Sequence, residues 1–116
     1  MVDPLIEIAH RGAPRRALEN TLQSFEMAKD AGARVFELDV WLSCDGHPVV
    51  LHDPTLKRLA RRHDKVSSMT LEQLQAVGLT GGYRIPPLER VLEALCEPGL
   101  KAYQYRAGKP PPSGGG

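Results

Sequence analysis

The sequence contains no hydrophobic run that is long enough to cross a membrane. A transmembrane helix needs ~20 consecutive apolar residues, and no stretch of the 116-residue chain approaches that length. Residues 1–8 also lack the basic and apolar segments of a secretory signal peptide. We therefore expect a protein without a transmembrane segment, and its predicted location is cytoplasmic.

Cysteine is scarce, and its spacing does not predict a metal site. Cys44 and Cys96 are the only two cysteines, and they match no metal-binding or redox motif. In a reducing compartment we expect both of them to be free thiols.

An excess of either charge is also absent. The 15 Lys and Arg residues balance the 14 Asp and Glu residues to a formal net charge of +1. This balance gives no reason to expect nucleic acid or an anionic membrane as a partner. One stretch is locally basic, and we interpret it as a solvated face: Lys57, Arg58, Arg61, Arg62 and Lys65.

Strand and helix patterns are present in an order that predicts the α/β class. Apolar segments at 5–9, 34–42 and 49–51 have the length and composition of strands. The turn pair Asp45-Gly46 separates the last two so closely that a parallel crossover is excluded, and we expect a hairpin.

Helical spacing follows each of two capping signals. Asn20 is the predicted N-cap of a first helix that ends before Gly32, with Gln23 completing a capping box. Thr70 and Gln73 have the same spacing at the start of a helix over 70–77, and a further helix is predicted over 86–95.

Two carboxylates occupy alternate positions of the central predicted strand. Glu37 and Asp39 leave the same face, with their backbones roughly 6.6 Å apart at ~3.3 Å per residue. Carboxylates this close repel each other unless a cation or proton lies between them, and Mg²⁺ or Ca²⁺ prefers such oxygen ligands. The simpler interpretation is a solvent-facing strand edge with two acids. The apolar opposite face and Trp41 in register argue against it.

Two histidines lie where predicted strands end. His10 ends the first strand and His52 the third, and two converging imidazoles can divide proton removal and proton donation between them. Arg11 offers a planar fork that suits a phosphate oxygen. Asp53 either orients His52 or caps the following segment. His47 and His63 are interpreted as surface residues.

These residues belong to an ordered set of motifs that resembles the glycerophosphodiester phosphodiesterase family. The resemblance covers about residues 5–95. It continues downstream through Thr55-Leu56, Arg58 and Ile85-Pro86-Pro87. Its main motifs are His10-Arg11-Gly12, Glu19-Asn20-Thr21, Glu37-Leu38-Asp39-Val40, Asp45-Gly46 and Val49-Val50-Leu51-His52-Asp53.

The resemblance implies a role for each of five residues. The histidines that match His10 and His52 form the acid and base pair, in an order that the sequence does not assign. The arginine that matches Arg11 contacts the substrate phosphate. The carboxylates that match Glu37 and Asp39 bind one divalent metal ion, Mg²⁺ or Ca²⁺. The implied substrates are glycerophosphodiesters, hydrolysed to glycerol 3-phosphate and an alcohol, and some relatives prefer lysophospholipids or other diesters.

The implied fold is the N-terminal fragment of a TIM (β/α)8 barrel, with a small insertion at about 43–82 after the second strand. Residues 1–102 are the predicted partial domain, and 103–116 are a predicted disordered tail rich in Pro and Gly. In the family a strand with a further acidic ligand and a lysine comes next, whereas Leu100-Lys101-Ala102-Tyr103 contains no acid.

Three functions are therefore compatible with the sequence. The first is metal-dependent diester hydrolysis, with this chain inactive alone. The others are a non-catalytic remnant and a small phosphate- or metal-binding fragment that uses Arg11, Glu37 and Asp39. With only two barrel strands expected, the apolar stripes of the flanking helices lack partners. We therefore expect these side chains to be unusually exposed: Leu22, Phe25, Leu88, Val91 and Leu92.

Overall fold

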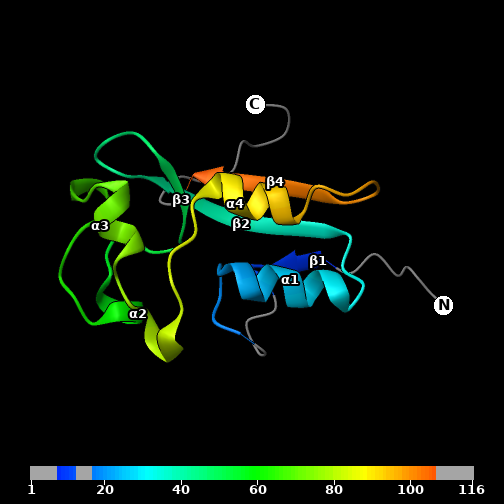
Figure 1. Cartoon of the computed structure of the whole chain (residues 1–116), viewed down its shortest axis with the longest axis horizontal. Helices are drawn as coiled ribbons and strands as arrows, with labels where there is room; N and C mark the ends of the chain where they lie inside the picture. The colour runs from blue at the N-terminus through cyan, green and yellow to red at the C-terminus, as the bar shows by residue number, and fades with distance from the viewer. Residues whose placement is uncertain (1–7, 13–16, 107–116) are drawn as a thin grey trace.

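The computed structural model describes residues 8–12 and 17–106 of the chain. A small sheet is covered on one face by two helices, with a further group of short helices beside it (Figure 1). In chain order the strands and α-helices are β1 (Ile8–His10), α1 (Leu22–Asp30), β2 (Val35–Leu42), β3 (Pro48–Val50), α2 (Lys57–Ala60), α3 (Leu71–Gln75), α4 (Leu88–Ala94) and β4 (Lys101–Arg106).

Strand β2 is the centre of the sheet, and three strands pair with it. β1 and β4 run parallel to β2, whereas β3 is antiparallel. Val35 pairs with residues of both β1 and β4, and Val40 pairs with residues of both β3 and β4. One edge of β2 is therefore occupied by β4, and β1 and β3 follow one another along the other edge.

The ends of β1 and β3 consequently meet beside the middle of β2. The backbone N–H of Arg11 donates to the carbonyl of Glu37 at 2.8 Å, and that of Leu51 donates to the carbonyl of Asp39 at 2.9 Å. The expected hairpin between β2 and β3 is present, and Gly46 in its turn has a φ of 83°. This geometry brings the segments of both predicted catalytic histidines to one place.

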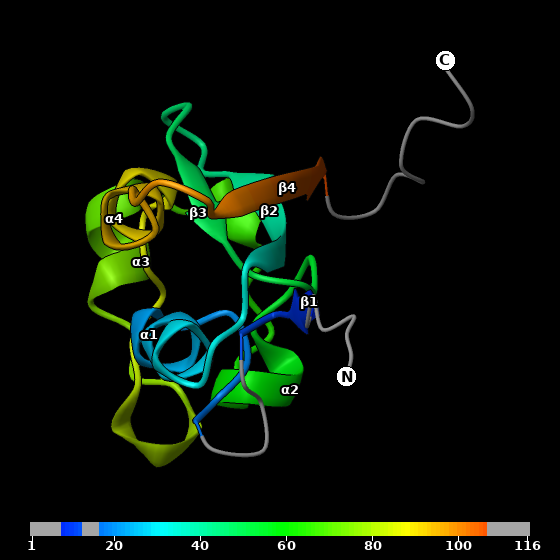
Figure 2. The same cartoon turned by 90° about the vertical axis from the view of Figure 1, so that its right-hand side faces the viewer.

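Helices α1 and α4 pack against each other and against one face of the sheet (Figures 1 and 2). Phe25 of α1, Phe36 of β2 and Val91 of α4 are fully buried in the core that they share. Lys29 on α1 joins the two helices further, because its ammonium donates to the carbonyl of Ala94 at 3.1 Å. The apolar face of β2 is thus turned toward the helices, and the face with Glu37 and Asp39 is turned away from them.

The segment between β3 and α4 has a hydrophobic core of its own. Its buried side chains include Leu56, Val66, Leu74 and Ile85. Thr70 and Gln73 form the predicted capping box at the start of α3. This core gives the insertion a fixed position beside the sheet, so that side chains on it can contact the site.

Three expectations from the sequence are corrected. Helix α1 is capped by Thr21, whose hydroxyl accepts from the N–H of Ser24, and not by Asn20. Phe25 and Val91 are buried, because α1 and α4 are partners for each other's apolar stripes even without a closed barrel. Leu22, Leu88 and Leu92 are partly buried.

The third correction concerns the C-terminal segment. Residues 101–106 form β4, a third parallel strand, so regular structure extends past the boundary expected at Tyr103. The alternation in this short polar segment is too weak to predict a strand, and pairing with β2 supplies the stability. Residues 107–116 lie outside the described part of the chain.

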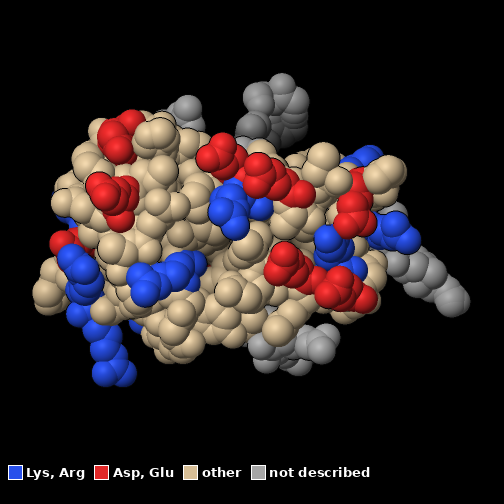
Figure 3. All heavy atoms as spheres, viewed as in Figure 1, with Lys and Arg blue, Asp and Glu red and all other residues tan. Residues whose placement is uncertain are grey.

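The surface agrees with the balanced composition. Acidic and basic side chains are interspersed on the face shown in Figure 3, with basic ones at the lower left, toward α2, and acidic ones at the upper left, toward α3. Cys44 and Cys96 are free and exposed. Among the described helices, none has the length and apolar character needed to cross a membrane.

Candidate active site

The carboxylate of Asp39 is the centre of the candidate site. Its side chain is only 17% exposed, and its Oδ2 lies 3.4 Å from the guanidinium Nε of Arg11. The same oxygen accepts a hydrogen bond of 3.1 Å from the amide Nδ2 of Asn20. Glu37 lies two residues earlier on the same face of β2 and is partly buried. Sequence alternation therefore places both predicted metal ligands on one face.

A tight turn after β1 brings Arg11 to Asp39. Arg11 has a φ of 58° and Gly12 a φ of 86°, a region that costs energy for residues with a Cβ. A Cβ on Gly12 would lie 2.3 Å from the hydroxyl oxygen of Ser24, so no side chain fits there. The turn is held by the carbonyl of Arg11, which accepts from the N–H of Asn20 at 2.8 Å and from the hydroxyl of Ser24 at 3.2 Å.

Asn20 was predicted to cap a helix, but it belongs to the site. Its side chain is 1% exposed, and its backbone has a φ of 57°. Its side-chain Nδ2 donates to Asp39, and its buried Oδ1 has no hydrogen-bond partner among the described residues. A buried amide oxygen is therefore held beside the carboxylate pair. The signal that could have located it is its position between Glu19 and Thr21 in the family-like motif.

His52 is held on both its ring and its backbone. Its Nδ1 lies 2.7 Å from Oδ1 of Asp53, and its carbonyl accepts a hydrogen bond of 3.0 Å from the indole N–H of Trp41. Trp41 lies on the same strand face as Asp39. The imidazole side chain remains 43% exposed, so a substrate can reach it. Of the two alternatives that sequence spacing left open for Asp53, the structure shows the contact with the His52 ring.

Arg58, which the sequence assigned to a solvated basic face, joins two acids near the site. Its guanidinium donates to both oxygens of Glu19, at 3.0 and 2.9 Å, and to Oδ2 of Asp53 at 2.8 Å. These hydrogen bonds lower the pKa of Glu19 and of Asp53 from their usual values. Glu19 also lies 3.5 Å from Nη1 of Arg11. All five members of the basic cluster, Arg58 included, are exposed, as predicted.

The remaining predicted residues are placed as follows. The backbone of His10 is in register with Glu37, next to the Arg11 turn, and its side chain lies outside the described part of the structure. His47 and His63 are exposed, as expected. Within the described residues, no group of three or more His, Cys, Asp or Glu side chains is arranged to hold a metal ion.

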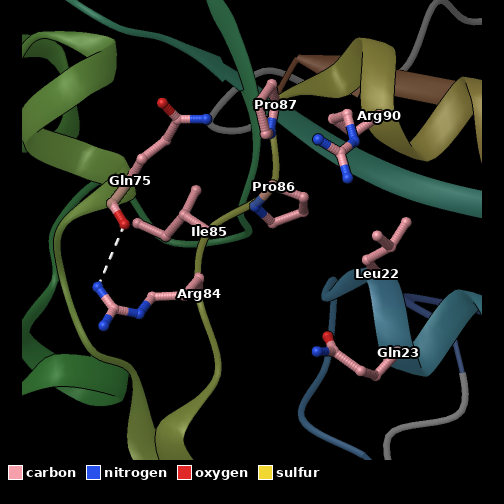
Figure 4. Close-up of a pocket in the computed structure, with 8 residues that line it drawn as sticks. All are labelled: Leu22, Gln23, Gln75, Arg84, Ile85, Pro86, Pro87 and Arg90. Atoms are coloured by element: carbon pink, nitrogen blue, oxygen red, sulfur yellow. Dashed lines mark hydrogen bonds between the residues drawn. The ribbon is translucent and has the colours of Figure 1, made fainter.

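A separate shallow pocket of about 240 Å³ lies between the start of α1, the end of α3 and the start of α4 (Figure 4). Its polar lining includes Arg84, which donates to the carbonyl of Gln75 at 3.3 Å, and Arg90. Its lining contains neither Asp39 nor His52. The residues predicted to form the site on the sheet therefore do not line this pocket.

Comparison with solved structures defines the class of this fold. A glycerophosphodiester phosphodiesterase from Thermotoga maritima superposes with a TM-score of 0.79 at 37% identity, covering 91% of this chain and 46% of that chain. An Oleispira antarctica phosphodiesterase, solved in complex with the product sn-glycerol-3-phosphate, gives 0.77 at 32% identity, covering 84% and 42%. The sheet, helices and insertion are a fragment of an α/β barrel of the TIM type.

Sequence comparison identifies the family. The model of the glycerophosphoryl diester phosphodiesterase family matches residues 10–107. A glycerophosphodiester phosphodiesterase from Caldanaerobacter subterraneus is 40% identical over 95 residues, which are 76% of this chain and 39% of that protein. The chain belongs to the glycerophosphoryl diester phosphodiesterase family, whose named members are phosphoric diester hydrolases. It spans less than half the length of the relatives it matches.

Proposed function

We propose that this chain supplies the phosphate-binding and acid–base half of a metal-dependent glycerophosphodiester phosphodiesterase. The reaction is hydrolysis of a glycerophosphodiester to glycerol 3-phosphate and an alcohol. One observation carries the proposal: the ends of β1 and β3 meet beside Glu37 and Asp39. Arg11 and the segments that contain both histidines therefore lie close to Asp39.

The donor set beside Asp39 fits a hard divalent cation such as Mg²⁺ or Ca²⁺. Glu37 and Asp39 are oxygen ligands on one strand face, and the buried Oδ1 of Asn20 is a further oxygen without a partner among the described residues. Hard cations take six or more oxygens, several of them from water or substrate. We propose Glu37 and Asp39 as the residues that hold one such ion. When bound, it offsets the charge that develops on the phosphoryl oxygens.

Side chains of this chain would bind the phosphate and transfer the protons. Arg11 is placed to exchange part of its contact with Asp39 for a phosphate oxygen, because its guanidinium has several donors and is 38% exposed. His52, with Nδ1 directed to Asp53, presents Nε2 as the nitrogen that takes or gives a proton. We propose His10 as its partner, so that one imidazole removes a proton and the other protonates the departing oxygen.

The family match favours this reaction over the two non-catalytic alternatives. For the substrate we propose a glycerophosphodiester or a lysophospholipid, as the resemblance implies. The product seen in the Oleispira antarctica structure makes glycerol 3-phosphate the natural probe.

A chimera provides the test. Residues 1–99 of this chain would replace the matching segment of the Thermotoga maritima protein, so that the relative's own strand follows α4. We expect release of glycerol 3-phosphate from glycerophosphocholine with Mg²⁺ or Ca²⁺. We expect His52→Ala to lower kcat by about 10²- to 10⁴-fold, the usual contribution of a general acid or base.

The exposed His63 supplies the matched control, and His63→Ala should leave turnover unchanged. The 116-residue chain alone is expected to show no turnover, because a TIM barrel needs eight strands. A chimera that unfolds cooperatively but releases no glycerol 3-phosphate would refute the proposal. Turnover that is unaffected by His52→Ala would refute the role of that residue.

A further inference from the structure

The guanidinium of Arg58 donates hydrogen bonds to two different acids, Glu19 and Asp53. It lies on α2, in the insertion, whereas Glu19 lies in the loop before α1 and Asp53 follows β3. Glu19 and Asp53 are 34 residues apart in the sequence. Arg58 therefore joins the β1–α1 loop to the β3 end through side chains.

The geometry continues from Arg58 to the ring of His52. Arg58 donates from Nε to Oδ2 of Asp53 at 2.8 Å, and from Nη2 to Oδ1 at 3.3 Å. Both carboxylate oxygens of Asp53 are thus fixed in direction. Oδ1 then lies 2.7 Å from Nδ1 of His52. An ionised carboxylate in this position can only accept a hydrogen bond, so it favours a proton on Nδ1 of His52.

We propose that Arg58 is a positioning residue that fixes the tautomer of His52. The guanidinium holds Asp53 as an oriented carboxylate, Asp53 holds the proton on Nδ1, and Nε2 is left as the acceptor at the site. Glu19 anchors the other side of the guanidinium, and its own side chain is only 12% exposed. The insertion thereby contributes to the site through a residue that touches no substrate. This role rests on the proposed function only in giving His52 a reaction to perform.

Free imidazole in water favours the tautomer with the proton on Nε2, so the proposed state is the less common one. It can be observed without turnover, from the ¹⁵N shifts of the His52 ring in the labelled 116-residue chain at a pH where the ring is neutral. His52→Gln identifies the signal. We expect the proton on Nδ1 in the unsubstituted chain. In Arg58→Ala we expect a shift toward the Nε2–H tautomer, with partial recovery in Arg58→Lys, which keeps the charge but not the fork.

Arg62 is a matched control, because its Nε pairs with Oδ1 of Asp64 at 2.7 Å on the same segment but has no link to His52. Arg62→Ala should leave the His52 tautomer unchanged. If Arg58→Ala does not fold, the nearly isosteric variant Asp53→Asn tests the proposal instead. The amide of this variant can no longer accept through two oxygens, so the fraction of His52 with its proton on Nδ1 should fall.

Two results would overturn the proposal. One is an Nε2–H tautomer in the unsubstituted chain. The other is an Nδ1–H tautomer that persists in folded Arg58→Ala, or in Asp53→Asn where Arg58→Ala does not fold. Neither result bears on whether the chimera hydrolyses glycerophosphodiesters, so failure of this inference is distinguishable from failure of the proposed function. In the chimera, Arg58→Ala should lower kcat with KM little changed, since Arg58 does not contact substrate.

Discussion

The side-chain amide of Asn20 donates a 3.1 Å hydrogen bond to the carboxylate of Asp39, from a residue that is 99% buried and 19 positions away in sequence. The contact fixes the β1–α1 loop against the acidic face of β2. It also holds an oxygen donor next to the proposed metal ligands. A neutral amide is needed there, because a carboxyl group would face Asp39 at the same short distance.

Asn20→Asp should therefore destabilise the chain at neutral pH. The introduced carboxyl would have a raised pKa, because the charge of Asp39 and burial both oppose its ionisation. A raised carboxyl pKa costs stability above that pKa, and the cost is relieved as pH falls through it. We expect a loss of about 1–3 kcal/mol at pH 7, measured by urea unfolding, that shrinks at pH 5 or with millimolar Mg²⁺.

Asn20→Leu is the control for that variant. It removes the same hydrogen bond without adding a charge, so its loss of stability should not depend on pH or on Mg²⁺. Equal pH dependence in the two variants would mean that charge beside Asp39 is not the cause.

Gly12→Ala tests the turn that places Arg11. The new Cβ would lie 2.3 Å from Oγ and 2.7 Å from the carbonyl carbon of Ser24, and the backbone of Ser24 cannot move without shifting α1. We expect a loss of about 2–4 kcal/mol, from overpacking together with the positive φ. Gly46→Ala has nearly the same φ of 83° but nothing within 4 Å of its Cβ. It should cost only about 1 kcal/mol. Equal costs in urea unfolding would show that the contact with Ser24 is unimportant.

The Arg58 ion pairs predict a specific acid sensitivity. The hydrogen bonds from Arg58 lower the pKa of Glu19 and Asp53 in the folded state. A lowered carboxyl pKa stabilises the fold above the unfolded values of about 4.3 and 3.9. That contribution disappears as pH falls through the lower folded values. Arg58→Ala should thus be less stable than the parent chain at pH 7, by no more than about 1 kcal/mol because Arg58 is half exposed.

The difference in stability between the two chains should shrink as pH falls below the unfolded values and through the lowered folded pKa values of Glu19 and Asp53, where these carboxylates become protonated. Urea midpoints at pH 7, 5 and 3 measure this convergence. A difference that stays constant across these pH values would mean that Arg58 acts through packing and not through its two acids.

Sequence patterning predicted the parts of this fold that depend on neighbours in the chain. The alternation along β2, the hairpin at Gly46 and the capping box of Thr70 all follow from local rules, and the structure confirms them. The ordered set of motifs predicted the family, although no single residue would have done so, and the family match confirms that prediction.

Features that depend on distant contacts were predicted less well. Asn20 is of a residue type that is common at helix N-caps. Its hydrogen bond to Asp39 depends on how the loop packs against the sheet, which the local sequence does not predict. Arg58 lies in a basic run, and the fold of the insertion decides that it faces Glu19 and Asp53. Likewise β4 has little strand character of its own, and its pairing with six residues of β2 makes it a strand.

We propose that Arg11, Glu37 and Asp39 form one site for a divalent cation and a phosphate on this chain. Paramagnetic Mn²⁺ tests it directly, because it broadens the amide signals of nearby residues and its effect falls steeply with distance. We predict that Mn²⁺ added to the ¹⁵N-labelled chain broadens the signals of Arg11, Glu37 and Asp39 first, and does so at lower concentration when glycerol 3-phosphate is present.

The effect should be lost in the double variant Glu37→Gln and Asp39→Asn, which removes both charged oxygen ligands. It should be retained in Glu89→Gln with Glu93→Gln, which removes two exposed acids from α4. Broadening that is centred on another acidic surface, or that persists unchanged in the Glu37 and Asp39 double variant, would contradict the account.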